Sequence, residues 1–218
     1  MSIKENYNEI VDKLKGTDVT LLVVSKYHTV EEIMEVYNLG HREFAENKVQ
    51  DMVAKMEVLP DDIKWHLIGH LQKNKVKYIY DKIRLLHSLD SYELALEIDK
   101  RCAPSGRVMS ALVEINIARE ESKGGILPES LADFVEEIKD KKSISIRGFM
   151  TMAPAKLSHS DYVEYFKQTR DISQKIWKEV LGNEGAPFLS MGMSGSLEAA
   201  VECGSSCVRI GSDLFKKE

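Results

Sequence analysis

Short apolar runs alternate along this chain with segments whose apolar residues recur at helical spacing. The clearest run, Thr20–Ser25 with Val19 before it, is apolar and β-branched, as expected of a strand buried on both faces of a parallel sheet. Further strand-like runs follow at 42–45, 64–68, 83–88, 108–117, 143–149, 187–190 and 207–210. Eight runs, each but the last followed by a clear helical segment, predict a parallel sheet covered by helices.

Helix signals mark the segments between the runs. Apolar residues from Ile3 to Leu14 lie at helical spacing and Gly16 follows as a stop signal, so we expect the chain to open with an extra helix. Thr29 and Glu32 form a capping box at the start of the next helix. Other helical segments are expected near 49–56, 72–80, 91–102, 128–138, 162–180 and 196–202, with a final turn at 212–217.

The number of alternating units constrains the architecture. Eight units are the number that closes into a barrel, and an open, doubly wound sheet is the alternative on pattern alone. No Gly-, Pro- or Ser-rich linker and no shift in composition interrupts the alternation, so one domain is expected over residues 1–218. The predicted fold is therefore an α/β, single-domain (β/α)8 TIM barrel with an extra helix at its amino terminus.

Composition limits the classes of function. The 218 residues are 43% hydrophobic and carry a formal net charge of −5, which excludes a disordered chain and argues against a nucleic-acid binder. No apolar run is long enough for a membrane helix, and the first residues lack the apolar core of a signal peptide. We therefore expect a soluble, cytoplasmic protein with no membrane partner.

The cysteines and histidines do not form a metal-binding pattern. Cys102, Cys203 and Cys207 make no even set, and we expect three reduced, structural thiols. His66 and His70 have a spacing known from metal-binding helices, but they straddle the end of a predicted strand and lack a nearby carboxylate in the sequence. Packing or hydrogen bonding is the favoured role for both, and no metal site is predicted.

Two loops rich in glycine and serine follow the last two predicted strands. In barrels of this type ligands bind at the carboxyl ends of the strands, and phosphate groups commonly dock at the loops after strands seven and eight. Here those loops offer backbone N–H groups at Gly192, Gly195 and Gly211. They also offer the hydroxyls of Ser194 and Ser212. Either loop taken alone is best interpreted as an ordinary turn. Because both loops follow the two strands where phosphate commonly docks, together they predict a site for a phosphate dianion.

Lys26 directly follows the most buried of the predicted strands. A long charged side chain is seldom placed there without a partner, although a surface lysine at a strand end is the plain alternative. A lysine and a phosphate site at one barrel mouth suit a Schiff base with a phosphorylated aldehyde. Pyridoxal 5′-phosphate (PLP) is the commonest cofactor of that description, so Lys26 is the candidate residue that binds it.

Five blocks of the sequence carry a family resemblance. They are VSKYHTVEEI around Lys26, FAENKVQD at 44–51, WHLIGHLQKNK at 65–75, IRGFMTMAP at 146–154 and LSMGMSGSLEAAVECGSSCVRIGSDLF at 189–215. In this order and spacing they resemble the pyridoxal phosphate homeostasis protein family, and the match runs through nearly the whole chain.

The resemblance implies a barrel like the amino-terminal domain of alanine racemase, which is fold type III among PLP proteins. It also implies PLP as a covalently bound cofactor. The binding residues that it implies are Lys26 for the Schiff base, Ser190, Ser194, Arg209, Gly211 and Ser212 for the phosphate loops, and Asn47, His66 and Met150 around the cofactor.

The function that the resemblance implies is to bind, buffer and deliver PLP in vitamin B6 and amino-acid homeostasis. PLP-dependent apo-enzymes are the candidate recipients. No established catalysis is implied, and no residue is assigned as catalytic. We expect a monomer, because no long exposed apolar stripe is apparent in the sequence.

Other functions stay open on the residues alone. One is a weak PLP-dependent amino-acid racemase, for which His28, two residues beyond Lys26, is a weak candidate proton relay. Another is a Schiff-base aldolase or sugar-phosphate isomerase, for which Glu46 is the nearby acidic candidate. The last is an interaction protein that uses the basic segment from Lys73 to Arg84.

Overall fold

The computed structural model describes residues 2–120 and 123–216, and eight parallel strands in this part of the chain close into a barrel. The strands pair in sequence order, and β1 pairs with both β2 and β8. The strands are β1 (Thr20–Val24), β2 (Glu43–Glu46), β3 (Lys64–Leu67), β4 (Leu85–Leu89), β5 (Met109–Ile115), β6 (Ile144–Thr151), β7 (Phe188–Ser190) and β8 (Cys207–Ile210). This closure confirms the predicted barrel and excludes the open, doubly wound sheet.

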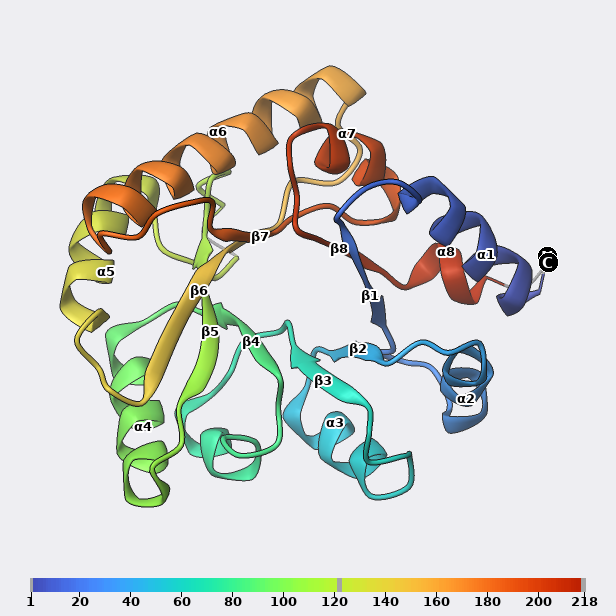
Figure 1. Cartoon of the computed structure of the whole chain (residues 1–218), viewed down its shortest axis with the longest axis horizontal. Helices are drawn as coiled ribbons and strands as arrows, with labels where there is room; N and C mark the ends of the chain where they lie inside the picture. The colour runs from blue at the N-terminus through green and yellow to red at the C-terminus, as the bar shows by residue number, and fades with distance from the viewer. Residues whose placement is uncertain (1, 121–122, 217–218) are drawn as a thin grey trace.

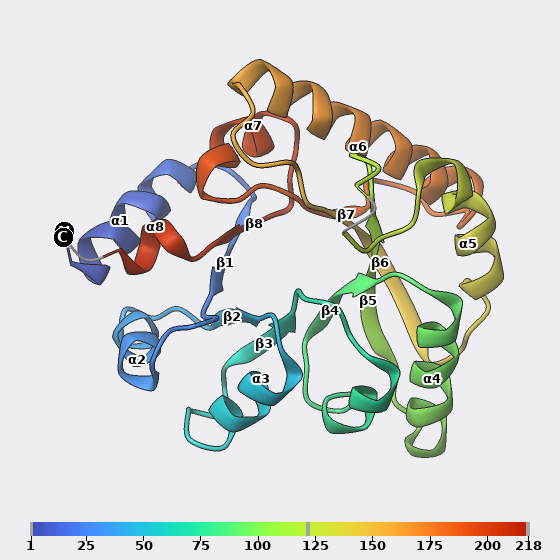
Figure 2. The ribbon, with the colours of Figure 1, turned by 180° about the vertical axis from the view of Figure 1, so that it is seen from behind.

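Helices form a ring outside the strands (Figures 1 and 2). The α-helices are α1 (Ile3–Leu14), α2 (Val30–Asn38), α3 (Val49–Met56), α4 (Tyr92–Cys102), α5 (Leu131–Ile138), α6 (His159–Glu179), α7 (Leu197–Glu202) and α8 (Ser212–Phe215). Short 3-10 helices are η1 (Lys73–Tyr78), η2 (Ala103–Ser105), η3 (Pro128–Ser130) and η4 (Ser194–Ser196). The predicted final turn is α8, and residue 217, where it was expected to end, lies outside the described residues.

The helix ends follow the sequence signals. Thr29 Oγ1 accepts a hydrogen bond from the backbone N–H of Glu32 at 3.3 Å, and the Glu32 carboxylate accepts one from the N–H of Thr29 at 3.1 Å. This is the predicted capping box at the start of α2. Asn6 Nδ2 donates to the carbonyls of Leu214 and Lys216, so α1 lies beside α8 (Figure 1).

One expected helix has a different form. The segment predicted as an α-helix over 72–80 is the 3-10 helix η1. Val76 is the fully buried apolar residue of η1, and Ile79, which caps it, is also fully buried. One buried position per turn is too narrow an apolar stripe for a longer α-helix to pack on. Pro128 likewise begins the 3-10 turn η3, and α5 starts only at Leu131.

Apolar residues pack on both sides of the strands. On β1, Leu21 and Val23 face the helix layer, whereas Leu22 and Val24 belong to an apolar cluster inside the barrel. Lys26 follows two residues after Val24, past the carboxyl end of β1. The carboxyl ends of the strands form the mouth of the barrel, so Lys26 lies at that mouth.

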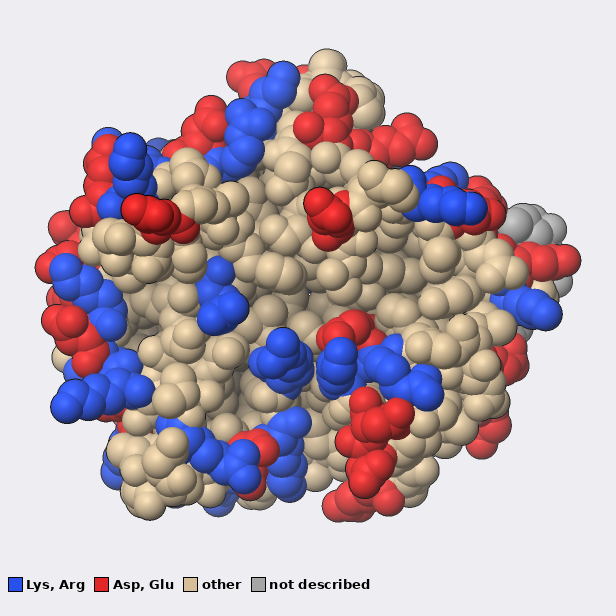
Figure 3. Space-filling view, in the orientation of Figure 1, with Lys and Arg blue, Asp and Glu red and all other residues tan. Residues whose placement is uncertain are grey.

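The surface carries charges of both signs. On the face shown in Figure 3, acidic side chains lie among the lysines and arginines, with uncharged surface between them. Within residues 2–120 and 123–216, no helix combines the length and the apolar character that crossing a membrane requires.

Candidate functional site

Lys26 lies in a tight turn at the carboxyl end of β1. The N–H of His28 donates to the carbonyl of Ser25 at 3.0 Å, which closes a four-residue turn. Tyr27 occupies the left-handed region with φ of 70°, a conformation that costs a non-glycine residue energy and is concentrated at functional sites. The turn leaves Lys26 half-buried, with its ammonium group 5.8 Å from the centroid of the Tyr27 ring. In the described ranges no hydrogen bond or ion pair joins this ammonium group to another residue.

The turn also removes His28 from the neighbourhood expected for it. The predicted relay role assumed an extended chain, with His28 on the same side as Lys26. Instead the His28 ring stacks on Phe215 with centroids 3.8 Å apart, and its Nδ1 lies 3.2 Å from Glu32 Oε2. This histidine therefore packs α8 against the start of α2.

Glu46, the nearby acidic candidate, points away from the barrel mouth. Its carboxylate is fully buried on the helix side of β2, where Oε1 accepts from Ser25 Oγ at 2.8 Å and from Lys55 Nζ at 2.6 Å. The Lys55 ammonium also donates to the carbonyl of Ser25. Glu46 thus holds α3 against the end of β1 and is engaged away from Lys26.

The two predicted phosphate loops meet at the mouth. Ser194 Oγ lies 3.3 Å from Ser212 Oγ, which joins the loop after β7 to the loop after β8. Both residues begin helical turns, η4 and α8, whose first backbone N–H groups have no partner within the helix. The loops therefore gather two hydroxyls and several N–H donors in one place.

Two glycines allow these loops to pack closely. A Cβ atom on Gly211 would lie 2.8 Å from the carbonyl oxygen of Val24, at the end of β1. Gly192 has φ of 98°, and a Cβ there would lie 2.4 Å from Cβ of Ala200. The loop after β8 thus packs directly on Val24, the last residue of β1, and Lys26 follows two residues later.

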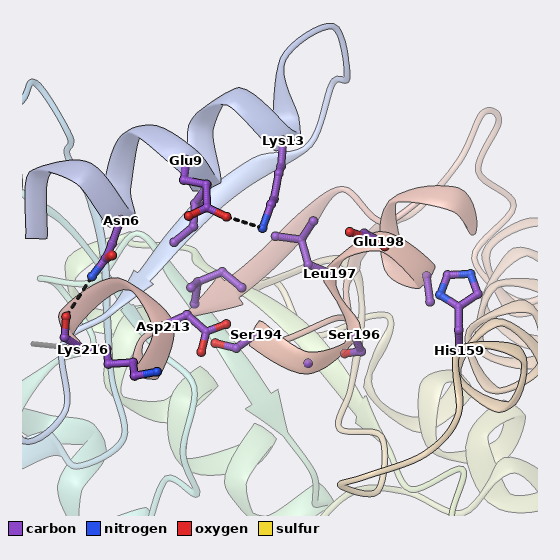
Figure 4. Close-up of a pocket in the computed structure, with 14 residues that line it drawn as sticks. Asn6, Glu9, Lys13, His159, Ser194, Ser196, Leu197, Glu198, Asp213 and Lys216 are labelled. Carbon is purple, nitrogen blue, oxygen red and sulfur yellow. Dashed lines mark hydrogen bonds and ion pairs between the residues drawn. The ribbon is translucent and has the colours of Figure 1, made fainter. Parts of the chain in front are cut away.

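A cavity of about 400 Å³ lies next to these loops but not over Lys26. Figure 4 shows Ser194 and Ser196 on one side of it and residues of α1 across from them. Three carboxylates line it, and Lys13 bonds to one of them at 2.8 Å. The carboxylates are those of Glu9, Glu198 and Asp213. Lys13, Lys216 and His159 also line it, so the cavity has no excess of positive charge for an anion. It also lies away from Lys26, and we therefore place the candidate site on the Lys26 side of the loops, inside the barrel mouth.

Arg209 lies below the loops, inside the barrel. Its Nη1 donates to Ser190 Oγ at 2.6 Å and to the Ser190 carbonyl at 2.7 Å, and its Nη2 donates to the Thr151 carbonyl at 2.8 Å. Arg209 is 4% exposed and Ser190 is fully buried. Both residues predicted on the phosphate loops by position therefore form the floor beneath those loops.

Asn47, His66 and Met150 occupy three different levels of the barrel. Asn47 lies at the mouth and lines a cavity of about 270 Å³ together with His70. Met150 packs in the barrel interior and is 1% exposed. His66 lies lower, at the amino-terminal end, where its Nε2 is 2.7 Å from Glu43 Oε2. The structure therefore brings Asn47 alone of the three to the mouth.

The sequence analysis did not single out two buried polar residues of the barrel interior, His87 and Glu114. His87 on β4 lies between His66 and Ser190, with 2.9 Å hydrogen bonds to each. Glu114 on β5 is 5% exposed. Burial, reinforced by the nearby Asp90 carboxylate, raises the pKa of Glu114 to about 7. The available signal was a titratable residue at an inward position of a largely apolar strand.

The histidines and acidic residues do not gather as metal ligands. Within the two described ranges, no group of three or more His, Cys, Asp or Glu side chains is placed to hold a metal ion. The mouth instead combines one half-buried amine with hydroxyl and N–H donors, which is a donor set for an anionic organic ligand.

Comparison with known proteins first places the chain in a class. The family model of the alanine racemase N-terminal domain matches residues 1–218. Alanine racemase from Corynebacterium glutamicum shares the fold, with a TM-score of 0.75 at 11% identity over 99% of this chain and 61% of that one. The barrel is therefore of the alanine racemase N-terminal type.

Nearer relatives define the particular family. The pyridoxal phosphate homeostasis protein of Aquifex aeolicus is 42% identical over 196 residues, covering 89% of this chain and 85% of the relative. That of Schizosaccharomyces pombe is 34% identical over 215 residues, covering 95% and 88%. This chain belongs to the pyridoxal phosphate homeostasis protein family.

A solved structure resembles the whole barrel. PipY of Synechococcus elongatus without PLP has a TM-score of 0.90 at 32% identity, and the match covers 99% of this chain and 100% of PipY. The same protein with PLP bound has a TM-score of 0.88 at 31% identity and the same coverage.

Proposed function

We propose that this protein binds PLP covalently at Lys26 and holds its phosphate group with the loops after β7 and β8. The observation that carries the proposal is the close packing of Gly211 on Val24, which sets the Ser212 loop beside the strand end that presents Lys26. The 3.3 Å contact between Ser194 and Ser212 then adds the second loop to the same place. The PLP-bound structure of PipY, a relative with the same barrel, supports this assignment.

The residues at the mouth fit the chemical groups of PLP. Hydroxyls and first-turn N–H groups suit a phosphate dianion, and Ser194, Gly211 and Ser212 would hold it. When bound, PLP supplies an aldehyde that condenses with a primary amine, and Lys26 is the half-buried amine here. We assign Asn47 to the rim of the cofactor site and Ser190 and Arg209 to its floor. Met150 and His66 lie deeper and would support it from below.

The proposed role is to bind, buffer and deliver PLP without catalytic turnover. Acid–base catalysis needs a titratable group aimed at the reacting atoms. His28 is stacked on Phe215, and Glu46 is bonded to Lys55 and Ser25, so both candidate groups near Lys26 are engaged elsewhere. Steady racemisation of an amino acid by the PLP-loaded protein would contradict this role.

Membership of the family supports the cellular part of the proposal. We place the protein in the cytoplasm as a monomer, with PLP-dependent apo-enzymes as the recipients of PLP. We also propose that residues 1–218 form one PLP-binding domain. Sedimentation of the purified protein, with and without PLP, tests the monomer directly.

A titration with PLP tests the binding site. The native protein should retain PLP through gel filtration with the visible absorption of a Schiff base. Lys26→Ala should lose that absorption, whereas Lys48→Ala, which removes an exposed lysine from the loop after β2, should keep it. Ser194→Ala with Ser212→Ala should weaken binding by about tenfold or more, since each hydroxyl donates to a charged group. Equal binding by all variants would overturn the proposal.

A further inference from the structure

Five side chains form a continuous hydrogen-bonded chain through the barrel interior. Arg209 Nη1 lies 2.6 Å from Ser190 Oγ. From Ser190 Oγ to His87 Nδ1 is 2.9 Å, and from His87 Nε2 to His66 Nδ1 is again 2.9 Å. His66 Nε2 then lies 2.7 Å from Glu43 Oε2. The chain runs from the floor of the proposed PLP site to the amino-terminal end of the barrel.

When both imidazoles are neutral, the chemistry of the two ends orients every hydrogen bond between them. Arginine only donates and an ionised carboxylate only accepts. Burial pushes the pKa of Glu43 upward, but hydrogen bonds from His66 and Lys64 outweigh it and lower the pKa to about 2, so this carboxylate is ionised. Ser190 Oγ accepts from Arg209 and directs its own hydrogen to His87.

Both histidines then have one defined tautomer. His87 accepts at Nδ1, so its hydrogen is on Nε2 and is donated to Nδ1 of His66. His66 in turn carries its hydrogen on Nε2 and donates it to Glu43. In this arrangement both imidazoles are neutral and every hydrogen bond has one donor and one acceptor.

A second arrangement differs from the first by one proton. A hydronium ion on the side of the PLP site gives its proton to Ser190 Oγ and leaves as water. This forms a new O–H bond, and the original Ser190 hydrogen passes to Nδ1 of His87. The Nε2 hydrogen of His87 then passes to Nδ1 of His66. The added proton ends on His66, which becomes an imidazolium beside the Glu43 carboxylate, and the new Ser190 hydroxyl points toward the site.

The lower end of the chain opens on a second cavity. Glu43 and His66 line a space of about 330 Å³ at the amino-terminal ends of the strands, together with Ser110, Arg84 and Arg147. Glu43 is half-buried there, whereas His87 is fully buried. Proton exchange with solvent is therefore open at the Glu43 and His66 end and closed in the middle.

We propose that this chain carries a proton between Ser190 and His66, so that the protonation of His66 at the lower cavity sets the hydrogen bonding at the floor of the PLP site. The link to PLP rests on the proposed function. The two arrangements of the hydrogen-bonded side chains rest only on the contacts described above. The charged and titratable groups around His66 are Glu43, His41 and His87, with Arg84 and Arg147 at the cavity. Around its partners in the hydrogen-bonded chain they are Lys64 at Glu43, and Cys207 and Arg209 on β8.

Nuclear magnetic resonance of the histidine ring nitrogens tests the coupling between His66 and His87 in the protein without PLP. At pH 8 both His66 and His87 should be neutral with hydrogen on Nε2. As the pH falls and His66 gains a proton, His87 should change to the Nδ1–H tautomer with the same midpoint. A His87 tautomer that stays constant through the His66 titration, or that changes at a different pH, would overturn the inference.

Three variants sharpen this test. Glu43→Gln removes the carboxylate that stabilises the imidazolium and should lower the His66 midpoint by about one pH unit or more. Ser190→Ala removes the only chain member that can accept from Nδ1 of His87, so His87 should stay in its Nε2–H form as the pH falls. His70→Gln removes an exposed histidine that bonds to Asp90, outside the chain, and should change neither. If Glu43→Gln and Ser190→Ala both leave the titration of His66 and His87 as in the native protein, the proposed proton path is wrong.

Adding PLP tests the coupling to the site. Because PLP is anionic, its binding should raise the His66 midpoint by about half a pH unit in the native protein, and linkage makes this coupling reciprocal. Lys26→Ala should abolish this rise while keeping the coupled titration of His66 and His87. Bound PLP that leaves the midpoint unmoved would refute the coupling, whereas failure of PLP to bind would refute only the proposed function.

Discussion

Arg209 and Ser190 are joined twice, through the hydroxyl of Ser190 at 2.6 Å and through its carbonyl at 2.7 Å. The second nitrogen of the guanidinium donates to Thr151, so one side chain from β8 bridges β7 and β6. These contacts form beneath the loops that bring Ser194 to Ser212. The floor of the site is therefore part of the framework that closes the barrel.

Removing this cation should destabilise the fold. Arg209→Met leaves two buried carbonyls and a hydroxyl without their donor, and we expect a loss of about 3–5 kcal/mol in the free energy of unfolding. Arg147→Met, at an exposed arginine, should change it by less than about 0.5 kcal/mol. Urea unfolding of both variants measures the difference, and equal stabilities would show that Arg209 does not brace the barrel.

Two glycines of the phosphate loops should respond differently to alanine. At Gly211 the added Cβ would lie 2.8 Å from the Val24 carbonyl, so the loop must move and Gly211→Ala should cost about 1–3 kcal/mol. At Gly195 no atom lies within 4 Å of the added Cβ, and Gly195→Ala should be nearly neutral for stability. Thermal unfolding without PLP makes the comparison. A neutral Gly211→Ala would mean that the loop is not packed on β1 as described.

Glu114 should make the protein less stable as the pH rises. Burial and Asp90 raise its pKa to about 7 from an ordinary value of 4.5, so the folded protein holds a proton that the unfolded chain releases. The free energy of unfolding should therefore fall between about pH 4.5 and pH 7 through this group. Glu114→Gln should remove this contribution and stabilise the protein at pH 8 by about 1–3 kcal/mol. Denaturant unfolding at pH 5 and pH 8 checks it, and a native-like pH dependence in the variant would contradict it.

The three thiols should be unreactive in the folded protein. All are free and buried, and burial raises the pKa of Cys102 and Cys203 and takes that of Cys207 to about 12. Because the thiolate is the reactive form, iodoacetamide at pH 8 should label them slowly in the native state and rapidly in urea. Fast labelling of any one in the native state would show that its surroundings open to solvent.

Most of the fold could be predicted because its signals are local. The apolar run before Lys26 and the capping box of Thr29 and Glu32 depend only on neighbouring residues, and the structure has both at the expected positions. The form of η1 could not be predicted, because it depends on which residues the barrel buries, and that is Val76 within η1 and Ile79 at its cap.

The site was predictable in part for the same reason. Lys26, Ser194 and Ser212 follow strand ends, so the barrel alone indicates that they face one mouth. The His66–His87 bond depends on the register between strands, which neighbouring residues do not determine. His28 was misplaced because the left-handed turn at Tyr27 carries no glycine to signal it.

Covalent trapping at Lys26 tests the central claim most directly. PLP is added to the purified protein, the mixture is reduced with borohydride, and the modified peptide is mapped by mass. A single pyridoxyl group on Lys26, absent from Lys26→Ala and present in Lys48→Ala, is the predicted result. Labelling spread over surface lysines, or the same labelling in Lys26→Ala, would contradict the assignment of Lys26 as the residue that binds PLP.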